Sequence, residues 1–229
     1  MSNRIIGIEG LVGAGKTSIC RELLKIIPDS VFINCGNLYR AIVAVLIKNG
    51  STLQELKDNA KEIDLKQLMD YFKIEVRLEN NETIVYCDNE KLDEELLQSK
   101  EVSIAVSSLG GKTNEGAAVE FLRNLVKELS EKYTLIISGR GIMKLFPQTT
   151  DHLFIMADLD VRAERKHMQY PEITLEEVRK NIVERDMLQK RAGYYDLHEI
   201  SQVIDVTECK SVKESTDLVL KELDLNILV

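Results

Sequence analysis

The chain has 229 residues with a formal net charge of −8, and 44% of the residues are hydrophobic. This composition suits one domain with an ample core, and the acidic balance argues against a nucleic-acid-binding face, which needs clustered Lys and Arg. The four cysteines lack metal-ligand or redox spacing, and no apolar run approaches the about 20 residues of a membrane span, so we expect a cytoplasmic protein without nucleic-acid or membrane partners.

The first predicted elements are a buried strand, a glycine-rich loop and a helix. Apolar residues at 5–8 precede the sequence GLVGAGKT at 10–17, and apolar positions with helical spacing follow it. This order is typical of a P-loop, in which backbone N–H groups converge on a polyphosphate, a lysine neutralises its oxygens and a hydroxyl ligates Mg²⁺. We therefore predict a nucleotide site, with Thr17 as the Mg²⁺ ligand, at Gly10, Gly13, Ala14, Gly15, Lys16, Thr17 and Ser18.

The next segments predict an α/β succession with an insert. A strand is expected at 31–34, a helix at 37–48, a further helix after Ser51-Thr52, and a short helix at 65–71. Polar and apolar residues alternate at 73–79 and 83–87 around Asn80-Asn81, which indicates a β-hairpin. We interpret residues 62–98 as an insert in a single domain, 1–229, placed on the side where a second ligand, the acceptor of a phosphate, would bind.

The second half of the chain continues the alternation of helices and strands. Helices are expected at 94–97, 101–109 and 114–132, and strands at 134–138, 152–156 and 203–206. Two helices flank Tyr170-Pro171, the second with a capping box at Thr174 and Glu177, and Ser211 caps the last helix. The pattern predicts a doubly wound parallel sheet covered on both faces, with ligands at the carboxyl ends of its strands.

Basic residues gather in the segment 162–191, which holds eight Lys or Arg against six acids. We predict a helical lid at 158–192 that closes over phosphates, excludes water and supplies cations; a solvated surface is the alternative for each residue alone. Arg40 and Arg140 follow strands and should face the ligand crevice. Glu9 either orders water around Mg²⁺ or supports the turn.

Motifs along nearly the whole chain resemble those of bacterial cytidylate kinases, which are P-loop nucleoside monophosphate kinases. They comprise Ile8-Glu9-Gly10 with the P-loop, the hairpin insert, Phe146-Pro147, and the segments 36–40, 101–107, 137–140, 162–165 and 184–186. The resemblance implies a monomeric enzyme that moves the γ-phosphoryl of ATP, with Mg²⁺, in line onto a small nucleotide, with CMP or dCMP as first choice.

The resemblance also implies roles for individual residues. Arg40 would hold the acceptor phosphate, Ser107 the base, and Lys16 and Thr17 the ATP phosphates. The implied catalytic residues are Lys16, Arg140, Arg162, Arg165 and Arg185. The implied substrate-binding residues are Gly36, Arg40, Ser107, Arg140, Arg185 and Arg191, the last reached with a one-residue deletion.

The chain departs from the family pattern where the family reads the base and the ribose. Two carboxylates, a base-contacting arginine and a ribose-contacting aspartate are replaced by Ser138, Gly141, Gly116 and Gln189. Because lost hydrogen-bond partners relax acceptor choice, two alternatives stay open. One is a kinase for another nucleotide or small metabolite, and the other is a catalytically idle nucleotide-binding protein.

Overall fold

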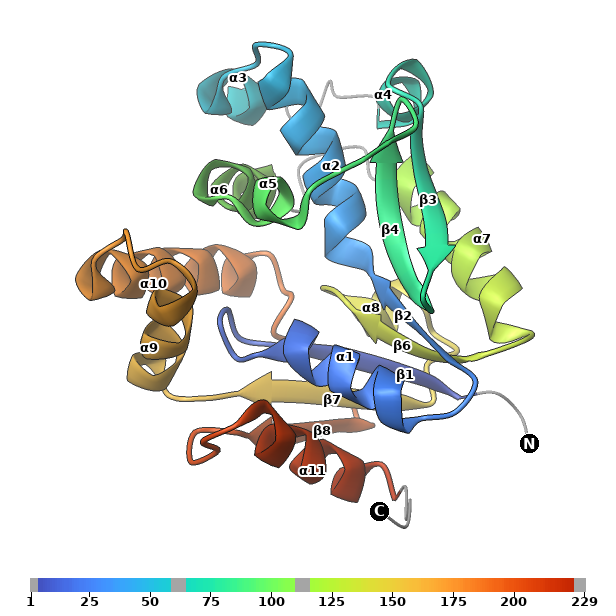
Figure 1. Ribbon diagram of the computed structural model, residues 1–229, viewed down its shortest axis with the longest axis vertical. Coiled ribbons are helices and arrows are strands. Elements are labelled where there is room, and N and C mark those ends of the chain that lie inside the picture. The colour runs from blue at the N-terminus through green and yellow to red at the C-terminus, as the bar shows by residue number, and fades with distance from the viewer. Residues whose placement is uncertain (1–3, 59–64, 110–115, 225–229) are drawn as a thin grey trace.

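The computed structural model describes residues 4–58, 65–109 and 116–224, and a central β-sheet organises them (Figure 1). The first half of the chain contains β1 (Ile5–Gly10), α1 (Lys16–Ile26), β2 (Ser30–Asn34), α2 (Cys35–Lys48), α3 (Leu53–Asp58), α4 (Leu65–Tyr71), β3 (Ile74–Glu79), β4 (Glu82–Cys87), β5 (Glu90–Lys91), α5 (Glu94–Gln98) and α6 (Lys100–Leu109). The second half contains α7 (Gly116–Ser130), β6 (Thr134–Ser138), α8 (Ile142–Leu145), β7 (Asp151–Met156), α9 (Leu159–Gln169), α10 (Leu175–Arg191), β8 (Ser201–Asp205) and α11 (Val212–Glu222).

The strand order in this part of the chain is β3-β4-β2-β6-β1-β7-β8, with β5 on β4. Neighbours from β4 to β8 run parallel, whereas β3 and β5 are antiparallel to β4. The predicted parallel α/β sheet of P-loop kinase type is therefore confirmed. Its parallel strands end at the same edge, and the loops that leave this edge form the site described below.

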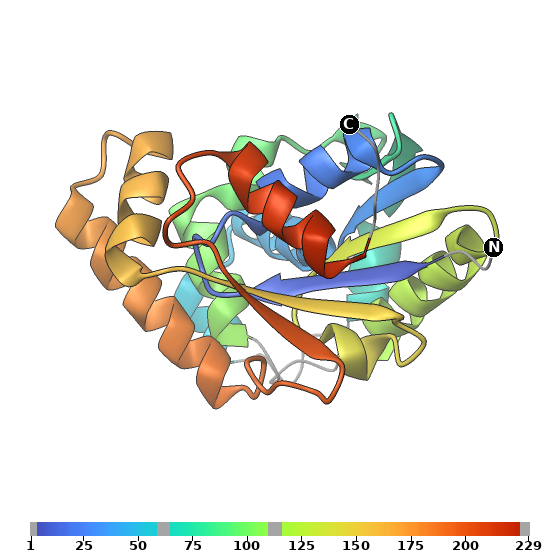
Figure 2. The same ribbon diagram turned by 90° about the horizontal axis from the view of Figure 1, so that it is seen from below.

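Both faces of the sheet are covered by helices. In β1, Ile5 packs into a core cluster with residues of α2 and α7, whereas Ile6 and Ile8 pack into a second cluster with residues of α1 and α11. Figures 1 and 2 show α1 and α11 together on one side of the sheet. Burial on both faces explains why these strands are apolar runs rather than alternating ones.

The predicted hairpin is present and continues the main sheet. Asn80 and Asn81 have positive φ values of 48° and 62°, the conformation that tight hairpin turns favour. Phe32 of β2 pairs with Glu82 of β4, and the Phe32 backbone N–H donates to the Asn81 carbonyl at 2.8 Å. Arg21 of α1 also binds the Glu82 carboxylate at 2.9 Å. The boundaries 62–98 and 158–192 for the insert and the lid stay predictions.

The helix ends follow their sequence signals. Thr174 and Glu177 form the complete capping box of α10, and the Ser211 hydroxyl accepts the Glu214 backbone N–H at 3.1 Å. Two elements were not anticipated, β5 and α8. With two and four residues, both are shorter than the window over which periodicity is informative.

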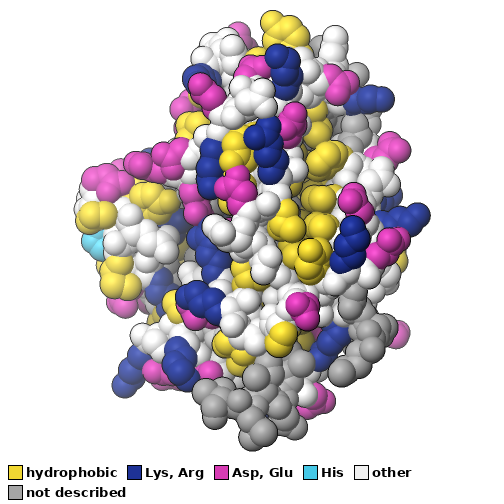
Figure 3. Space-filling model, turned by 45° about the vertical axis from the view of Figure 1, so that its right-hand side comes forward, with side chains coloured by type: hydrophobic (Ala, Val, Ile, Leu, Met, Phe, Trp, Pro, Cys, Tyr) yellow, Lys and Arg dark blue, Asp and Glu magenta, His cyan; other side chains and the backbone are white. Residues whose placement is uncertain are grey.

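The surface carries charges of both signs. On the face that Figure 3 shows, Lys and Arg alternate with Asp and Glu, and hydrophobic side chains lie between them. None of the helices in the described ranges is long and apolar enough to cross a membrane.

Candidate active site

The carboxyl ends of the parallel strands open into one cavity of about 1260 Å³. Its walls come from the P-loop and α1, helices α2, α5, α6 and α7, the β6–α8 turn with α8, helices α9 and α10, and the β8–α11 loop with the start of α11. A pocket for one small ligand usually measures about 300–1,000 Å³. The cavity therefore has room for two ligands side by side.

The P-loop glycines stand where side chains would clash or strain the backbone. Gly10 has φ +141°, and a Cβ there would lie 2.0 Å from the Ile155 carbonyl oxygen. Gly15 has φ +89° and forms the N-cap of α1. Residues Gly13, Ala14, Gly15, Lys16, Thr17 and Ser18 line the cavity. The first turn of α1 thus presents backbone N–H groups to the cavity, an arrangement that attracts anions.

Lys16 bends back over its own loop. Its Nζ donates to the carbonyl oxygens of Gly10 at 3.0 Å and Leu11 at 2.6 Å. Burial and the guanidinium groups of Arg140 and Arg185 hold the pKa of Lys16 well below its usual value. The lysine therefore sits among cations in a poorly solvated place, where an anionic ligand would stabilise its charge.

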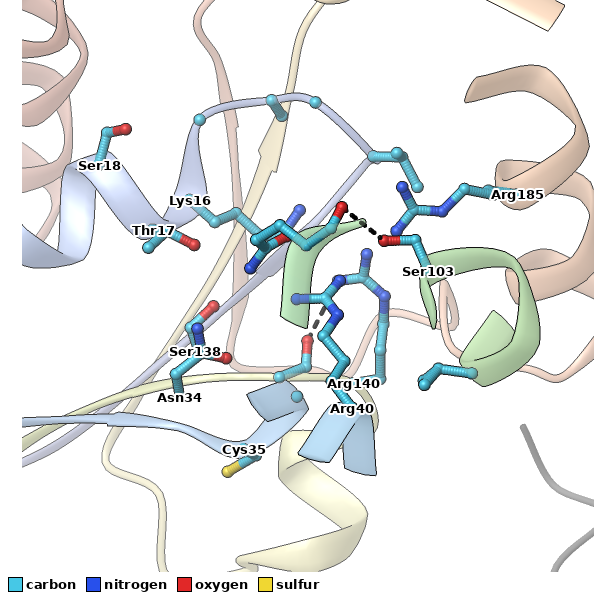
Figure 4. Close-up of a pocket in the computed structure, with 18 of the residues that line it drawn as sticks. Lys16, Thr17, Ser18, Asn34, Cys35, Arg40, Ser103, Ser138, Arg140 and Arg185 are labelled. Carbon is cyan, nitrogen blue, oxygen red and sulfur yellow. Dashed lines mark hydrogen bonds between the residues drawn. The ribbon is translucent and has the colours of Figure 1, made fainter. Parts of the chain in front are cut away.

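Three arginines from separate elements point toward Lys16 (Figure 4). Arg40 belongs to α2, Arg140 to the turn after β6, and Arg185 to α10. Burial, followed by repulsion from the neighbouring guanidinium groups, lowers the pKa of Arg40 to about 9 and that of Arg185 to about 10. In the described residues, neither of their buried Nε atoms has a hydrogen-bond partner. A cluster of mutually repelling, incompletely bonded cations favours a polyanion.

Arg140 and Lys166 complete the cationic wall. Arg140 Nε donates to Gln189 Oε1 at 2.8 Å, and its Nη1 donates to the Gly139 carbonyl at 3.1 Å. Lys166 of α9 lines the same cavity, and burial, Arg185 and Arg40 lower its pKa to about 8. Lys166 was not among the predicted site residues, although it directly follows Arg165 in the basic segment.

Arg162 is held by protein groups. Its Nε donates to the Ala157 carbonyl at 2.8 Å, and its Nη1 donates to the Val12 carbonyl at 2.8 Å and to Asp186 Oδ2 at 2.6 Å. Asp186 in turn accepts the Val12 backbone N–H at 3.1 Å. Arg162 and Asp186 therefore join α9 and α10 to the P-loop backbone, and a catalytic role for Arg162 stays a prediction.

The other predicted residues are distributed unevenly. Arg165 lines the cavity and donates to the carbonyls of Val206 at 2.9 Å and Cys209 at 2.7 Å. Gly36 lines the cavity at the start of α2. Arg191 is exposed and is not among the cavity-lining residues of the described chain. Ser107 belongs to α6, but its side chain lies outside the described part of the structure.

Two departures from the family pattern have local structural correlates. Ser138 is buried at the end of β6, where it lines the cavity. Gly141 has φ +61°, and a Cβ there would meet the Tyr194 ring at 3.6 Å. An aspartate at position 141 would therefore need a left-handed backbone conformation, with its Cβ in ordinary contact with the Tyr194 ring.

Glu9 is buried and has structural contacts. Its Oε1 accepts the Ile142 backbone N–H at 2.6 Å, and its Oε2 lies 3.3 Å from His152 Nε2. His152 Nδ1 is 2.7 Å from the Ser201 hydroxyl. These contacts join the end of β1 to the turn between β6 and α8, and a role of Glu9 in ordering water around Mg²⁺ or in supporting the P-loop turn stays a prediction.

The residues around Thr17 fit a Mg²⁺ ion that arrives with a nucleotide. The Thr17 hydroxyl, on the first turn of α1, is a hard oxygen ligand at the cavity wall. No group of three or more His, Cys, Asp or Glu residues suited to a metal occurs in the described ranges. Mg²⁺ commonly combines few protein ligands with waters and phosphate oxygens, so this limited donor set is compatible with the ion.

A glycine loop after a central parallel strand, a helix N-terminus and converging cations define a P-loop phosphotransferase. The sequence also matches the family model described as cytidylate kinase over residues 6–224. The chain belongs to the cytidylate kinase family and is a nucleoside monophosphate kinase, which implies ATP as phosphate donor and a small nucleotide as substrate.

Individual relatives match over nearly their whole length. A cytidylate kinase of Clostridioides difficile is 27% identical over 98% of this chain and 100% of its own length. One of Fusobacterium nucleatum is 24% identical over 98% and 99%. Shikimate kinase from Bacteroides thetaiotaomicron covers 97% of this chain and 99% of its own, with 16% identity and a TM-score of 0.48. That structural similarity is too low to support a conclusion, and the fold assignment stands on the strand order above.

Proposed function

We propose that the protein transfers the γ-phosphoryl group of ATP to CMP or dCMP and so forms ADP and CDP or dCDP. The observation that carries the proposal is the convergence of Lys16, Arg40, Arg140 and Arg185 on a cavity with room for two nucleotides. Phosphoryl transfer depends chiefly on holding two anionic reactants in line and stabilising the charge between them. Four cations from four elements supply that environment.

The donor site is proposed at the P-loop. The α1 N-terminus and Lys16 would bind the β- and γ-phosphates, and Lys16 would exchange its bonds to Gly10 and Leu11 for bonds to phosphate oxygens. Thr17 would hold Mg²⁺, whose charge would neutralise the donor phosphates. Arg165 and the β8–α11 loop would lie beside the rest of the donor nucleotide.

The acceptor site is proposed at the start of α2. Arg40 and Arg185 would bind the acceptor phosphate, with Gly36 beside them. Because a phosphate monoester is already anionic near neutral pH, one of its oxygens attacks the γ-phosphorus without a side-chain base. The bond from the γ-phosphorus to the β,γ-bridging oxygen breaks, and that oxygen leaves with ADP.

The choice of CMP draws on the names of the relatives, which are cytidylate kinases. The described residues are also compatible with another acceptor, because Ser138 and Gly141 provide no carboxylate that could recognise cytosine. UMP, AMP or a small metabolite phosphate is therefore the competing acceptor.

The test is an acceptor panel of CMP, dCMP, UMP and AMP with ATP and Mg²⁺, monitored by coupled ADP detection. We expect CMP or dCMP to give the highest kcat/KM and Lys16→Ala to abolish turnover. A higher kcat/KM with UMP or AMP would reject the cytidylate assignment. ATP-dependent thermal stabilisation without turnover of any acceptor would instead support the idle nucleotide-binding protein.

We also propose that the enzyme works as a monomer in the cytoplasm. All four converging cations come from one chain, so the cavity needs no second subunit. Light scattering during gel filtration would show about the 26.0 kDa of one chain, and a dimer mass at assay concentration would reject the monomer.

A further inference from the structure

Tyr195 lies on the turn after α10, beside Arg140. Its ring meets the Phe154 ring edge to face at 5.6 Å between centroids, and the Arg140 guanidinium carbon lies 6.0 Å from its centroid. Its hydroxyl oxygen is 2.6 Å from Asp186 Oδ1 and 2.7 Å from Gln189 Oε1. Burial raises the pKa of Tyr195, and the hydrogen bond to Asp186 adds to this effect. The hydroxyl therefore keeps its proton and can donate it to one of the two oxygens at a time.

The two acceptors of Tyr195 connect it to two different parts of the site, Gln189 to Arg140 and Asp186 to the P-loop. Gln189 Oε1 also accepts from Arg140 Nε at 2.8 Å, and Asp186 Oδ1 also accepts from the Val12 backbone N–H at 3.1 Å. These contacts link Arg140 through Gln189, Tyr195 and Asp186 to the P-loop, and the single Tyr195 proton closes either the Gln189 half or the Asp186 half of this path at a time. Tyr195 is the middle of that path.

Arg140 is oriented without being neutralised. The groups that accept its hydrogen bonds are the Gln189 amide oxygen and the Gly139 carbonyl. Neither carries a full charge, so the charge of Arg140 stays available to a phosphate, whereas a carboxylate partner would compete with the phosphate. When the Tyr195 hydroxyl donates to Gln189 Oε1, it holds this oxygen in its direction toward Arg140.

We propose that Tyr195 is a positioning residue that aims Arg140 at the phosphates through Gln189 and couples it to the P-loop through Asp186. As far as it concerns phosphoryl transfer, this inference rests on the proposed function. It goes beyond that function because it assigns a role to a side chain that is not among those lining the cavity. The alternative is that Tyr195 only packs against Phe154.

The direct test is Tyr195→Phe, which keeps the ring and removes the hydroxyl. A misdirected Arg140 contacts the donor phosphates less well and also stabilises the charge of the transition state less. We therefore expect kcat to fall about 10-fold and KM for ATP to rise about 3- to 10-fold, while KM for the acceptor changes less than about 2-fold. Tyr71→Phe, on an exposed tyrosine that is not among the cavity-lining residues, should leave the kinetic parameters unchanged. Unchanged kcat in Tyr195→Phe would overturn the proposal.

A double-mutant cycle separates positioning from general structural damage. If Tyr195 acts through Arg140, then Tyr195→Phe should lower kcat less than about 2-fold in an Arg140→Ala background. If the two losses multiply in full, Tyr195 does not act through Arg140 and the proposal is wrong. Gln189→Leu breaks the path at its next member and should show the same dependence on Arg140. It provides the cycle if Tyr195→Phe does not fold.

A binding measurement keeps this inference distinct from the proposed function. Calorimetry with inorganic tripolyphosphate needs no acceptor, and Tyr195→Phe should weaken its binding about 3- to 10-fold, but only when Arg140 is present. If the wild-type protein phosphorylates no nucleotide, the proposed function fails, and this binding cycle still decides the role of Tyr195. Equal tripolyphosphate affinity of the wild type and Tyr195→Phe would then overturn the positioning role.

Discussion

At Arg40 the fold places a guanidinium beside Arg140 and Arg185, and its pKa falls to about 9 through burial and repulsion. Such a side chain disfavours the folded state of the protein without ligand. The same desolvation strengthens its attraction to a phosphate. A residue of this kind exchanges stability for binding, and the two effects can be measured separately.

Arg40→Ala should weaken use of the acceptor and stabilise the fold. Loss of a charge-assisted hydrogen bond is worth about 1.5–3 kcal/mol, so kcat/KM for the acceptor should fall about 10- to 150-fold. KM for ATP should stay nearly constant. Steady-state kinetics with each substrate varied in turn would check the effect, and differential scanning calorimetry should show a raised Tm.

The control for this substitution is Arg77→Ala, because Arg77 lies on β3 outside the cavity lining, where it is half-buried and pairs with Glu75. It should leave the kinetics unchanged, and the loss of its contacts with the Tyr86 ring and Asn89 should lower rather than raise the Tm. Unchanged acceptor kinetics in Arg40→Ala would show that the acceptor phosphate binds elsewhere.

The lowered pKa of Lys166 predicts that a rise in pH increases the stability of the fold and decreases the affinity for anions. Its pKa in the folded protein is about 8 against a usual 10.5, so above pH 8 the folded state releases a proton that the unfolded state retains. Unfolding free energy therefore gains a contribution from Lys166 as the pH rises from 7 to 9. Affinity for tripolyphosphate should fall over the same range, because the neutral amine attracts anions less.

Comparison with Lys166→Met isolates this contribution from those of other groups. Urea unfolding at pH 7 and pH 9 should show that the free energy of unfolding of the wild type rises relative to that of the variant as the pH rises. Calorimetry should show a shallower loss of tripolyphosphate affinity for the variant. Parallel pH profiles for both proteins would contradict an effect of Lys166.

At the scale of elements, the connection between β1 and α1 needs glycine for two reasons. At Gly10 the backbone of β7 lies too close for a side chain, and at both Gly10 and Gly15 the φ angle is positive. Gly10→Ala should destabilise the protein by about 3 kcal/mol or more, because its Cβ would overlap the Ile155 carbonyl and β1 would have to move from β7. Gly15→Ala is the matched comparison, with positive φ but no atom within 4 Å of the added Cβ. It should lose only about 1–2 kcal/mol from backbone strain.

Urea titration of both alanine variants measures this difference. Equal losses of unfolding free energy would mean that backbone conformation alone, rather than contact with β7, makes glycine necessary at position 10.

The sequence predicted elements better than contacts. Strand β6 and helix α4 have the predicted bounds, and the capping box at Thr174 was found, because apolar periodicity and capping are local signals. The joining of the hairpin to β2 was not predicted, since hairpin alternation says nothing about what lies beyond its edge. By contrast, Arg40 and Arg140 were expected at the crevice because they follow strands, and Arg185 was expected there from the basic helical segment and the family resemblance. The path through Tyr195 and the burial of Lys166 depend on tertiary packing and carry no local signal.

For the whole molecule, the repelling cations imply stabilisation by multivalent anions. With an assumed Kd of ~1 mM, 20 mM pyrophosphate would add about 1.8 kcal/mol, or roughly 4–7 °C in Tm. Sodium chloride at equal ionic strength should give much less, because it screens the charges without bridging them. Thermal scans of the wild type and Arg185→Gln would check this, and the variant should show a higher Tm without pyrophosphate and a smaller increase with it. An equal response to both salts would contradict a specific anion site.

The pairing of β4 with β2 has a further consequence for the chain. Without the hairpin, β2 would border the sheet and offer unpaired peptide groups as a template for a strand from another molecule. The segment that the sequence marks as an insertion therefore also shields the core from intermolecular association, and variants shortened there would be prone to aggregate before any loss of chemistry was visible.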